Sequence, residues 1–300
     1  MKNLRISATA HGINYLPEYY AREHGLFADA GLDVTAEPRN PWDGVMHDLA
    51  DGSADVALGG LWVPAMYAHR GRDFVAFAQL NNRFPMTIVT REPVADFEWS
   101  WLAGRTLLVP GQGGTAPYEF TAGLMRRDGA DPAQTRFGRD LSTAMLVELF
   151  VNGLGDAIVA DPGTAATLVR AGQGHVAVSL ADAGGVMPNS VYYVRRERLD
   201  ELTPLLVPFA QAIQDATVQV AASTAESHIA LIGKEWPDAD TAALVDATDF
   251  LISSGTWTGV AIAREGVDNW TGVLHDAGLT VDRVAYSDIV TDAISKEVSP

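Results

Sequence analysis

Two short stretches near the start of the chain decide the fold class: EHGLFADAGLDV, residues 23–34, and LADGSADVALGGL, residues 49–61. In the first stretch the pattern predicts a helix that ends at Gly25, followed by a turn and a strand. In the second, a short apolar strand runs directly into Gly59-Gly60 and another helix. Both stretches place a loop at the carboxyl end of a strand, where open α/β sheets bind small ligands.

The same alternation of strands and helices continues along the chain. Apolar or alternating runs predict strands at 4–10, 32–38, 56–58, 74–80, 86–90, 105–110, 135–141, 156–160, 176–180 and 191–194. Ser142 or Thr143 is well placed to cap the helix that follows the strand at 135–141. From residue 199 onward the pattern predicts only helices, at 204–232, 240–253, 263–277 and 287–297. The chain therefore contains two sets of βα units followed by a helical tail.

Length and composition indicate a globular protein that is long enough for two lobes. The chain has 300 residues, of which 47% are hydrophobic and 20% are charged. Its net charge of −17 argues against nucleic acid and anionic membrane surfaces as partners. The absence of cysteine excludes disulfides, thiolate nucleophiles and cysteine-based metal sites.

The amino-terminal residues bear on localisation. MKNLRISATAHG passes from two basic residues into a strand without the apolar core of a signal peptide. We expect an intracellular protein, with an exported protein whose signal has been removed as the alternative. No apolar run is long enough to span a bilayer, so no membrane insertion is expected.

Five motifs in series resemble a known family: HGLFADAGLDV, LADGSADVALGG, GRTLLVPGQGGTAPYEF, VNGLGDAIVADP and the terminal DAGLTVDRV. Their order over nearly the whole chain is similar to that of the NMT1/THI5-like group of ABC-transporter substrate-binding proteins. This group takes nitrate, sulfonates, taurine or thiamine pyrimidines. The resemblance implies an α/β fold of the type II periplasmic-binding-protein kind, with two lobes and a helical C-terminal tail packing on lobe one.

The resemblance also implies how the chain is divided. Lobe one is expected to comprise residues 1–92 and 191–300, and lobe two residues 93–190. Hinge strands are expected near 86–90 and 191–194. The ligand is expected to lie between the lobes.

The glycine-rich loop after the strand at 105–110 is the leading candidate for ligand contact. Glycine lets backbone N–H groups face a bound anion or carbonyl, and the start of the next helix adds positive potential. The pattern also fits G-x-G-x-x-A of dinucleotide sites, a weak signal, and a tight strand-to-helix turn is the alternative. The candidate residues of this loop and helix are Gln112, Gly113, Gly114, Thr115 and Tyr118.

The polar loop after the first strand is a second candidate. His11, Asn14 and Tyr15 lie in it, although asparagine and glycine are also ordinary turn residues. In the pyrimidine-synthesising branch of the family, an Asn-His pair would fall on Asn14-Tyr15. The histidine is replaced here and that branch's cysteine-rich motif is absent, which disfavours pyrimidine synthesis.

Further candidates lie at strand-to-helix junctions and beside the hinge strands. Aromatic side chains among them suggest a stacking site for a flat ring, although buried packing explains each one equally well. A carboxylate at Asp161 can accept hydrogen bonds from an amine, or can cap the next helix. For Arg83 the alternative is a solvated charge. The residues are Trp42, Asp43, Gly60, Leu61, Trp62, Asn82, Arg83, Asp161, Asn189 and Tyr192.

Marks of metal, cofactor or covalent chemistry are missing from the sequence. The histidines are far apart, and neither H-E-x-x-H nor G-x-S-x-G nor a Walker loop occurs. We therefore expect no metal and no cofactor. A carboxylate pair, Asp161 with Asp43 or Glu119, remains open for acid–base work.

The sequence favours reversible binding of a small organic molecule, heteroaromatic, carboxylate or sulfonate, in an interlobe cleft. A monomer is expected, with an ABC-transporter permease as partner if the protein is exported. The first alternative is an intracellular decarboxylase or lyase on the same fold using His11, Tyr118 or Asp161. The family's desulfinase is excluded because it needs a catalytic cysteine. The second alternative is a cytosolic metabolite sensor.

Overall fold

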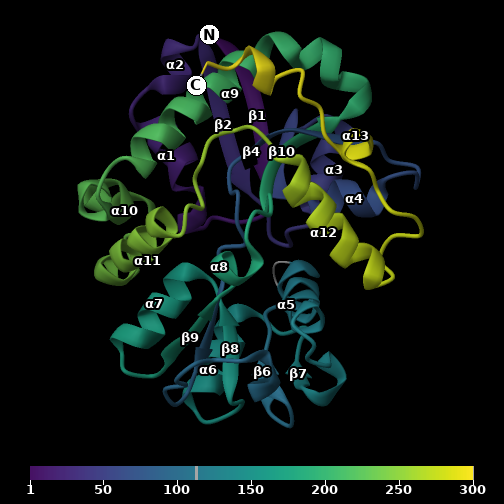
Figure 1. Ribbon diagram of the computed structural model, residues 1–300. Helices are drawn as coiled ribbons and strands as arrows, with labels where there is room; N and C mark the ends of the chain where they lie inside the picture. The colour runs from purple at the N-terminus through teal and green to yellow at the C-terminus, as the bar shows by residue number, and fades with distance from the viewer. Residues whose placement is uncertain (112–113, 300) are drawn as a thin grey trace.

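Residues 1–111 and 114–299 are described by the computed structural model, which forms two α/β lobes, one above the other in Figure 1. The first lobe is built on a five-stranded sheet of order β2-β1-β3-β10-β4. Its strands are β1 (Lys2–Ala8), β2 (Leu32–Pro38), β3 (Val56–Gly60), β4 (Phe74–Gln79) and β10 (Ser190–Arg195). Strand β10 runs antiparallel to β3 and β4, because it returns from the second lobe.

The second lobe repeats this plan with a five-stranded sheet of order β7-β6-β8-β5-β9. Its strands are β5 (Thr87–Thr90), β6 (Thr106–Leu108), β7 (Arg136–Gly138), β8 (Ala157–Ala160) and β9 (His175–Ser179). Strand β5 is antiparallel to both of its neighbours. Each sheet therefore contains one reversed strand that enters from the other lobe.

The lobe boundary falls earlier than the sequence indicated. Residues up to 92 were expected in lobe one, but β5 pairs with β8 and β9 of the second sheet. The chain therefore crosses in residues 80–86 and returns in residues 185–189. Hydrogen bonds join the two crossing segments, from Asn189 N to Asn81 O at 2.9 Å and from Met187 N to Asn82 O at 2.9 Å.

Short helices connect the strands, and local signals set their ends. Gly25 and Gly52 adopt left-handed backbone at the ends of helices, as glycine does most readily. In lobe one the helices are η1 (Ile13–Tyr15), α1 (Leu16–Glu23), α2 (Leu26–Asp29), α3 (Gly44–Asp51) and α4 (Trp62–Tyr67). In lobe two they are η2 (Trp99–Leu102), α5 (Ala116–Arg127), η3 (Pro132–Gln134), α6 (Thr143–Val151), α7 (Pro162–Arg170) and α8 (Leu180–Gly184).

The tail after β10 is helical, as expected, with two corrected boundaries. Its elements are η4 (Arg196–Arg198), α9 (Leu199–Ala221), η5 (Ala225–His228), α10 (Ile229–Glu235), α11 (Thr241–Ser253), α12 (Arg264–Asp276), α13 (Tyr286–Ile289) and η6 (Ser295–Glu297). The single helix expected at 204–232 is divided, since α9 ends before a turn at Ala222 and Ser223. The helix expected at 287–297 is also wrong. After Ile289 the backbone is extended, and Thr291 N donates to Ala76 O at 2.9 Å, which covers the edge strand β4.

The tail packs on lobe one and also reaches lobe two. Helix α9 packs on α1, and its Phe209 stacks on Phe27 with ring centroids 5.5 Å apart. Helix α11 packs on α7 of lobe two, and α12 packs on α5, on the two sides of the molecule seen in Figure 1. Trp270 of α12 meets Phe120 of α5 edge to face at 5.6 Å. The tail thus bridges the lobes.

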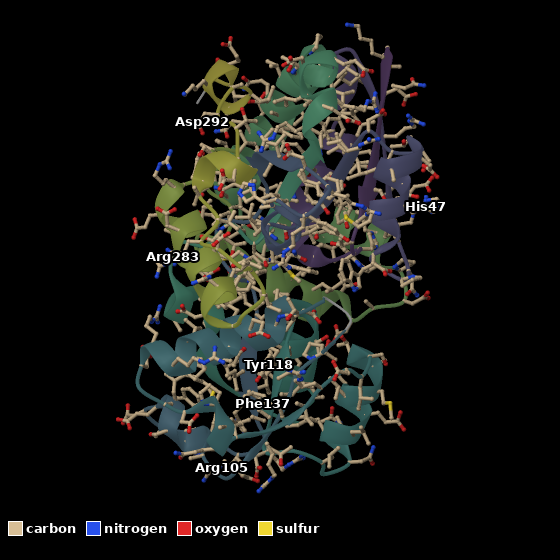
Figure 2. The ribbon with its side chains drawn as sticks, turned by 90° about the vertical axis from the view of Figure 1, so that its right-hand side faces the viewer. His47, Arg105, Tyr118, Phe137, Arg283 and Asp292 are labelled. Atoms are coloured by element: carbon tan, nitrogen blue, oxygen red, sulfur yellow. The ribbon has the colours of Figure 1, made fainter. Side chains whose placement is uncertain are left out.

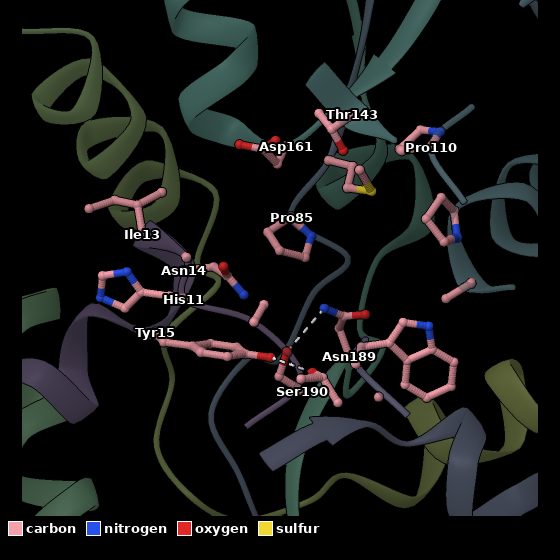
Figure 3. A pocket seen from close by; sticks show the side chains of 18 of the residues that line it. His11, Ile13, Asn14, Tyr15, Pro85, Pro110, Thr143, Asp161, Asn189 and Ser190 are labelled. Atoms are coloured by element: carbon pink, nitrogen blue, oxygen red, sulfur yellow. Dashed lines mark hydrogen bonds between the residues drawn. The ribbon is translucent and has the colours of Figure 1, made fainter. Parts of the chain in front are cut away.

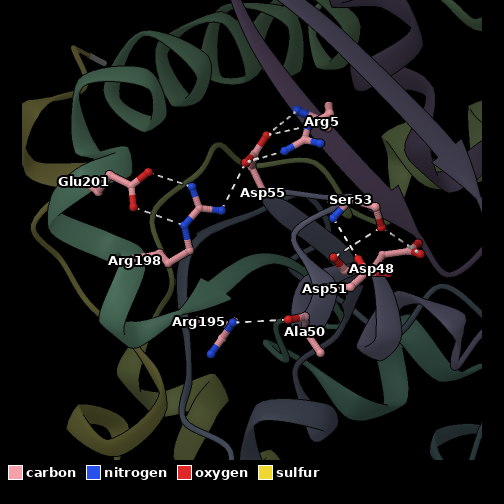
Figure 4. A network of polar contacts seen from close by, with 9 residues as sticks. All are labelled: Arg5, Asp48, Ala50, Asp51, Ser53, Asp55, Arg195, Arg198 and Glu201. Atoms are coloured by element: carbon pink, nitrogen blue, oxygen red, sulfur yellow. Dashed lines mark hydrogen bonds and ion pairs between the residues drawn. The ribbon is translucent and has the colours of Figure 1, made fainter.

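A polar network holds the amino-terminal end of the first sheet (Figure 4). The carboxylate of Asp55, which precedes β3, accepts from Arg5 at 3.1 Å and from Arg198 at 3.2 Å. These contacts join β1, β3 and the start of the tail. The guanidinium groups keep the pKa of Asp55 below its usual range against the effect of its own desolvation.

None of the helices in the described part of the chain combines the length and apolar character needed to cross a membrane.

Candidate ligand site

A cavity of about 530 Å³ lies between the lobes (Figure 3). Because parallel strands end at the same edge of a sheet, the loops after β1, β2, β3, β6 and β8 all open toward it. Lobe one and the crossing segments contribute Thr9, Ala10, His11, Gly12, Ile13, Asn14, Tyr15, Pro38, Arg39, Asn40, Trp42, Gly60, Trp62, Phe84, Pro85, Met86, Asn189 and Ser190. Lobe two contributes Pro110, Ala116, Pro117, Thr143, Asp161 and Pro162. Both lobes therefore form its walls.

A hydrogen-bonded group of side chains forms one wall of the cavity. The Tyr15 hydroxyl lies 3.3 Å from the Thr9 hydroxyl, and the ring is almost fully buried. Ser190 Oγ accepts from the side-chain amides of Asn81 and Asn189, both at 3.2 Å. Burial raises the pKa of Tyr15 above its ordinary value, so this hydroxyl keeps its proton at neutral pH. The wall offers hydroxyl and amide groups without a free charge.

Two tryptophans and a glycine form the contact across the cleft. Trp42 and Trp62 of lobe one meet at 5.1 Å in an edge-to-face arrangement. Gly114 of lobe two, with φ of +75°, lies against them. A Cβ atom there would stand 2.4 Å from Trp62 Cζ2 and 3.3 Å from Trp42 Cζ2. Only a residue without a side chain permits this close approach.

The charged side chains that line the cavity are already paired within the protein. Arg39 donates to the carboxylate of Asp48, with its Nη2 at 3.0 Å from Oδ1. His11 Nε2 lies 3.2 Å from the carboxylate of Glu235 on α10, and its ring stacks on Trp236 at 4.9 Å. A ligand would therefore meet few uncompensated charges on these walls.

Three helices of lobe two begin at the cavity, and they differ in how their first N–H groups are satisfied. Asp161 caps α7, since Oδ1 accepts from Thr164 N at 3.0 Å and Oδ2 from Thr164 Oγ1 at 2.6 Å. Ser142 caps α6 by accepting from Met145 N at 3.3 Å, as the sequence predicted. At the start of α5 Thr115, the described N-cap residue, makes no capping side-chain bond. The first N–H groups of a helix favour an acceptor atom, so the start of α5 is a candidate contact for a ligand.

Eight of the residues singled out from the sequence line the cavity. They come from both lobes and from the return crossing segment: His11, Asn14, Tyr15, Trp42, Gly60, Trp62, Asp161 and Asn189. Gly114 joins them through its contact with Trp62. Gln112 and Gly113 lie outside the described residues.

The remaining candidates are not among the lining residues. Asp43 is exposed at the start of α3, and Leu61 is fully buried in the core. Thr115 Oγ1 lies 3.5 Å from Glu119 on its own helix. Tyr118 packs edge to face on Phe137 with ring centroids 4.9 Å apart. Both residues are labelled in lobe two of Figure 2. Of the tyrosines expected in an aromatic stacking site, only Tyr15 lines the cavity, together with Trp42 and Trp62.

The candidates near the hinge hold the structure instead. The Arg83 guanidinium donates to Ala181 O at 3.2 Å and so links the first crossing segment to α8 of lobe two. Asn82 donates its backbone N–H to Thr256 O at 2.8 Å. Tyr192 is completely buried, and its hydroxyl donates to Glu18 Oε2 at 2.8 Å.

The three residues named for possible catalysis are not assembled into an acid–base site. Asp161 is engaged by the start of α7, His11 by Glu235, and Tyr118 lies outside the cavity lining. The pairing of Asp161 with Asp43 or Glu119 is not formed either, since only Asp161 lines the cavity. Within residues 1–111 and 114–299, no group of three or more His, Asp or Glu side chains is arranged to hold a metal ion.

Several lining residues were missed from the sequence. Thr9, Arg39 and Asn40 directly follow β1 and β2, so the rule about strand ends could have found them. Ser190 carried no such signal. It follows no parallel strand and reaches the cavity at the start of β10, where the chain returns from the other lobe.

Two α/β lobes, two crossing segments and a cavity walled by both lobes define the two-lobed class of binding-protein folds. The chain belongs to the NMT1/THI5-like family, whose model matches residues 13–227. This confirms the resemblance drawn from the motifs.

Individual relatives agree with this class. YtlA of Bacillus subtilis strain 168, named as a candidate binding protein, is 23% identical over all of this chain and 90% of its own. The ligand-binding component of an ABC-type import system from Staphylococcus aureus, solved with zinc bound, superposes with a TM-score of 0.81 at 14% identity, over 100% of this chain and 99% of that one. The alkanesulfonate-binding protein SsuA of Xanthomonas axonopodis pv. citri, bound to MOPS, gives a TM-score of 0.76 at 15% identity over 97% and 98%. At these identities the solved structures establish the fold.

Proposed function

We propose that this protein binds a small organic molecule between its lobes and hands it, unchanged, to an ABC-type importer. The observation that carries the proposal is the interlobe cavity of about 530 Å³, a volume that suits a compact organic ligand. The name of the Staphylococcus aureus import component supports a role in import, and the name of the alkanesulfonate-binding protein supports a small organic ligand.

The chemistry of the walls supports a flat or compact ligand with one acceptor end. Trp62 and the prolines around the cavity offer apolar faces, and the start of α5, where Thr115 makes no capping bond, offers N–H donors. Asn14, Asn189 and the hydroxyl of Tyr15 offer neutral hydrogen-bonding groups. Heteroaromatic, carboxylate and sulfonate compounds each combine such features.

A thermal-shift measurement with benzoate, benzenesulfonate and 4-aminopyrimidine tests the proposal. Binding to the folded state raises the melting temperature by mass action, and mass spectrometry of the mixture shows whether the compound is recovered unchanged. A stabilising probe recovered intact supports transport binding. Conversion of the probe would contradict it. Gel filtration of the same sample tests the proposed monomer.

A further inference from the structure

The loop between α11 and α12 reaches the ligand site from the far end of the sequence. Trp257 of this tail loop, residues 254–260, donates its indole N–H to the backbone carbonyl of Asn14 at 3.1 Å. The indole is only 3% exposed, within the core that also contains Ile13 and Tyr15. A buried donor without this partner would lose a hydrogen bond, so the contact is well specified.

The tail loop is itself fixed to the hinge. Gln79 at the end of β4 donates its backbone N–H to Val260 O at 2.9 Å, and Asn82 donates to Thr256 O at 2.8 Å. Val260 N donates to the side-chain oxygen of Gln214 on α9 at 2.9 Å. One short loop therefore touches α9, the first crossing segment and the wall of the cavity.

The carbonyl that Trp257 holds belongs to the pocket loop, residues 12–15. This loop forms a tight turn, in which Tyr15 N donates to Gly12 O at 2.9 Å, and all four of its residues line the cavity. Fixing the Asn14 backbone fixes the direction of its Cα–Cβ bond, and the side chain points into the cavity in Figure 3. The helices on either side of the tail loop, α11 and α12, pack on lobe two.

We propose that Trp257 is a positioning residue for the ligand site: its indole N–H holds the pocket loop in the conformation that receives the ligand. The inference rests on the proposed function, because it assigns Trp257 a part in that same site. It makes the C-terminal tail a component of ligand recognition.

Hydrogen exchange in the ligand-free protein tests whether the Trp257 indole holds the pocket loop. The substitution Trp257→Phe keeps a buried ring and removes the donor. Losing one hydrogen bond should speed exchange of the amides of residues 12–16 about fivefold. The matched control is Trp99→Phe, a buried tryptophan of lobe two, which should leave these amides unchanged. Unaltered exchange in Trp257→Phe would overturn the proposal.

A second variant guards against a folding defect at Trp257. Gln214→Leu removes the anchor of Val260 without touching the pocket loop, and should speed exchange of the same amides by about twofold. If Gln214→Leu slowed exchange of the amides of residues 12–16, or changed exchange only in α9, the tail loop would not hold the pocket loop in place.

Binding measurements then test the role in recognition, using whichever of benzoate, benzenesulfonate or 4-aminopyrimidine shifts the melting temperature most. Trp257→Phe should weaken binding about fivefold, and should add little in an Asn14→Ala background, because both changes act through one loop. Additive losses would show that Trp257 acts only on general stability. If no probe binds the wild type, the proposed function fails, while the exchange experiment still decides the role of Trp257.

Discussion

Gly114 of the second lobe lies directly against the indole of Trp62 of the first, so closely that a Cβ atom at position 114 would stand 2.4 Å from Trp62 Cζ2. The two residues belong to different lobes and meet beside the cavity. Their contact marks how closely the lobes approach in this structure.

Gly114→Ala should therefore prevent full closure and abolish the thermal shift caused by a bound probe. The matched control is Gly104→Ala, because Gly104 has nearly the same φ, +74°, but nothing within 4 Å of its Cβ position. Both variants should lose about 1 kcal/mol from the left-handed backbone, and only Gly114→Ala should lose binding. If the probe raised the melting temperature of both variants equally, the contact of Gly114 with Trp62 would not be needed for binding.

Trp62→Leu should weaken probe binding about tenfold, because an aromatic face of the cavity is replaced by a smaller aliphatic one. Isothermal titration calorimetry measures the change in the dissociation constant of the probe. Trp101→Leu is the control, since Trp101 is also a partly buried tryptophan but stacks on Arg105 at 4.2 Å. Arg105 lies at the far end of lobe two in Figure 2. A tenfold loss in the control as well would assign the effect to general destabilisation.

Glu18 should make the stability of the protein depend on pH. Burial raises the pKa of its carboxyl from 4.5 to about 7, while the hydrogen bond from Tyr192 opposes this effect. Between these values the folded protein keeps the proton and the unfolded chain has lost it. Stability should therefore fall as pH rises from 4.5 to 7, by about 3 kcal/mol from this group.

Glu18→Gln should remove that part of the pH dependence, because the amide mimics the protonated carboxyl. Urea unfolding of both proteins at pH 5 and at pH 7.5 measures it, and all other titrating groups cancel in the comparison. Parallel stability curves would show that Glu18 has an ordinary pKa in the folded protein.

Asp161 should behave as a helix cap. Asp161→Ala leaves the first N–H groups of α7 without their acceptor and should lower the free energy of unfolding by about 1 kcal/mol, whereas Asp161→Asn should preserve it. Urea unfolding of the two variants distinguishes them. A loss in Asp161→Asn equal to that in Asp161→Ala would mean that the charge, and not the cap, stabilises this loop.

The fold was predictable because its signals are local. Left-handed glycines such as Gly25 and caps such as Ser142 act within one turn of helix, so they are visible in the sequence. The helix expected at 287–297 was wrong for the opposite reason. The unpaired edge of β4, more than 200 residues earlier, binds the backbone after Ile289 and keeps it extended.

The candidate site was predictable in part. Loops that follow parallel strands meet at one edge of a sheet, and this rule placed His11, Asn14, Tyr15 and Asp161 at the cavity. It could not separate them from Leu61, because a residue beside the cavity and a residue beneath it can follow the same strand end. Tyr192, named from the expected hinge strand, is completely buried. Which side of the wall a side chain occupies depends on what packs behind it.

By itself, the sequence determined the fold class, the family and the set of loops that meet between the lobes, because periodicity, glycine positions and strand-end rules act over a few residues. Only the tertiary structure decided which charges are available. Asp48 neutralises Arg39, Glu235 binds His11, and the start of α7 holds Asp161. It also brought Trp257 to the carbonyl of Asn14. Asp161 is bound within its own turn of helix. In the other three pairs the two residues lie on separate elements, so the contact follows from packing and not from a local sequence pattern.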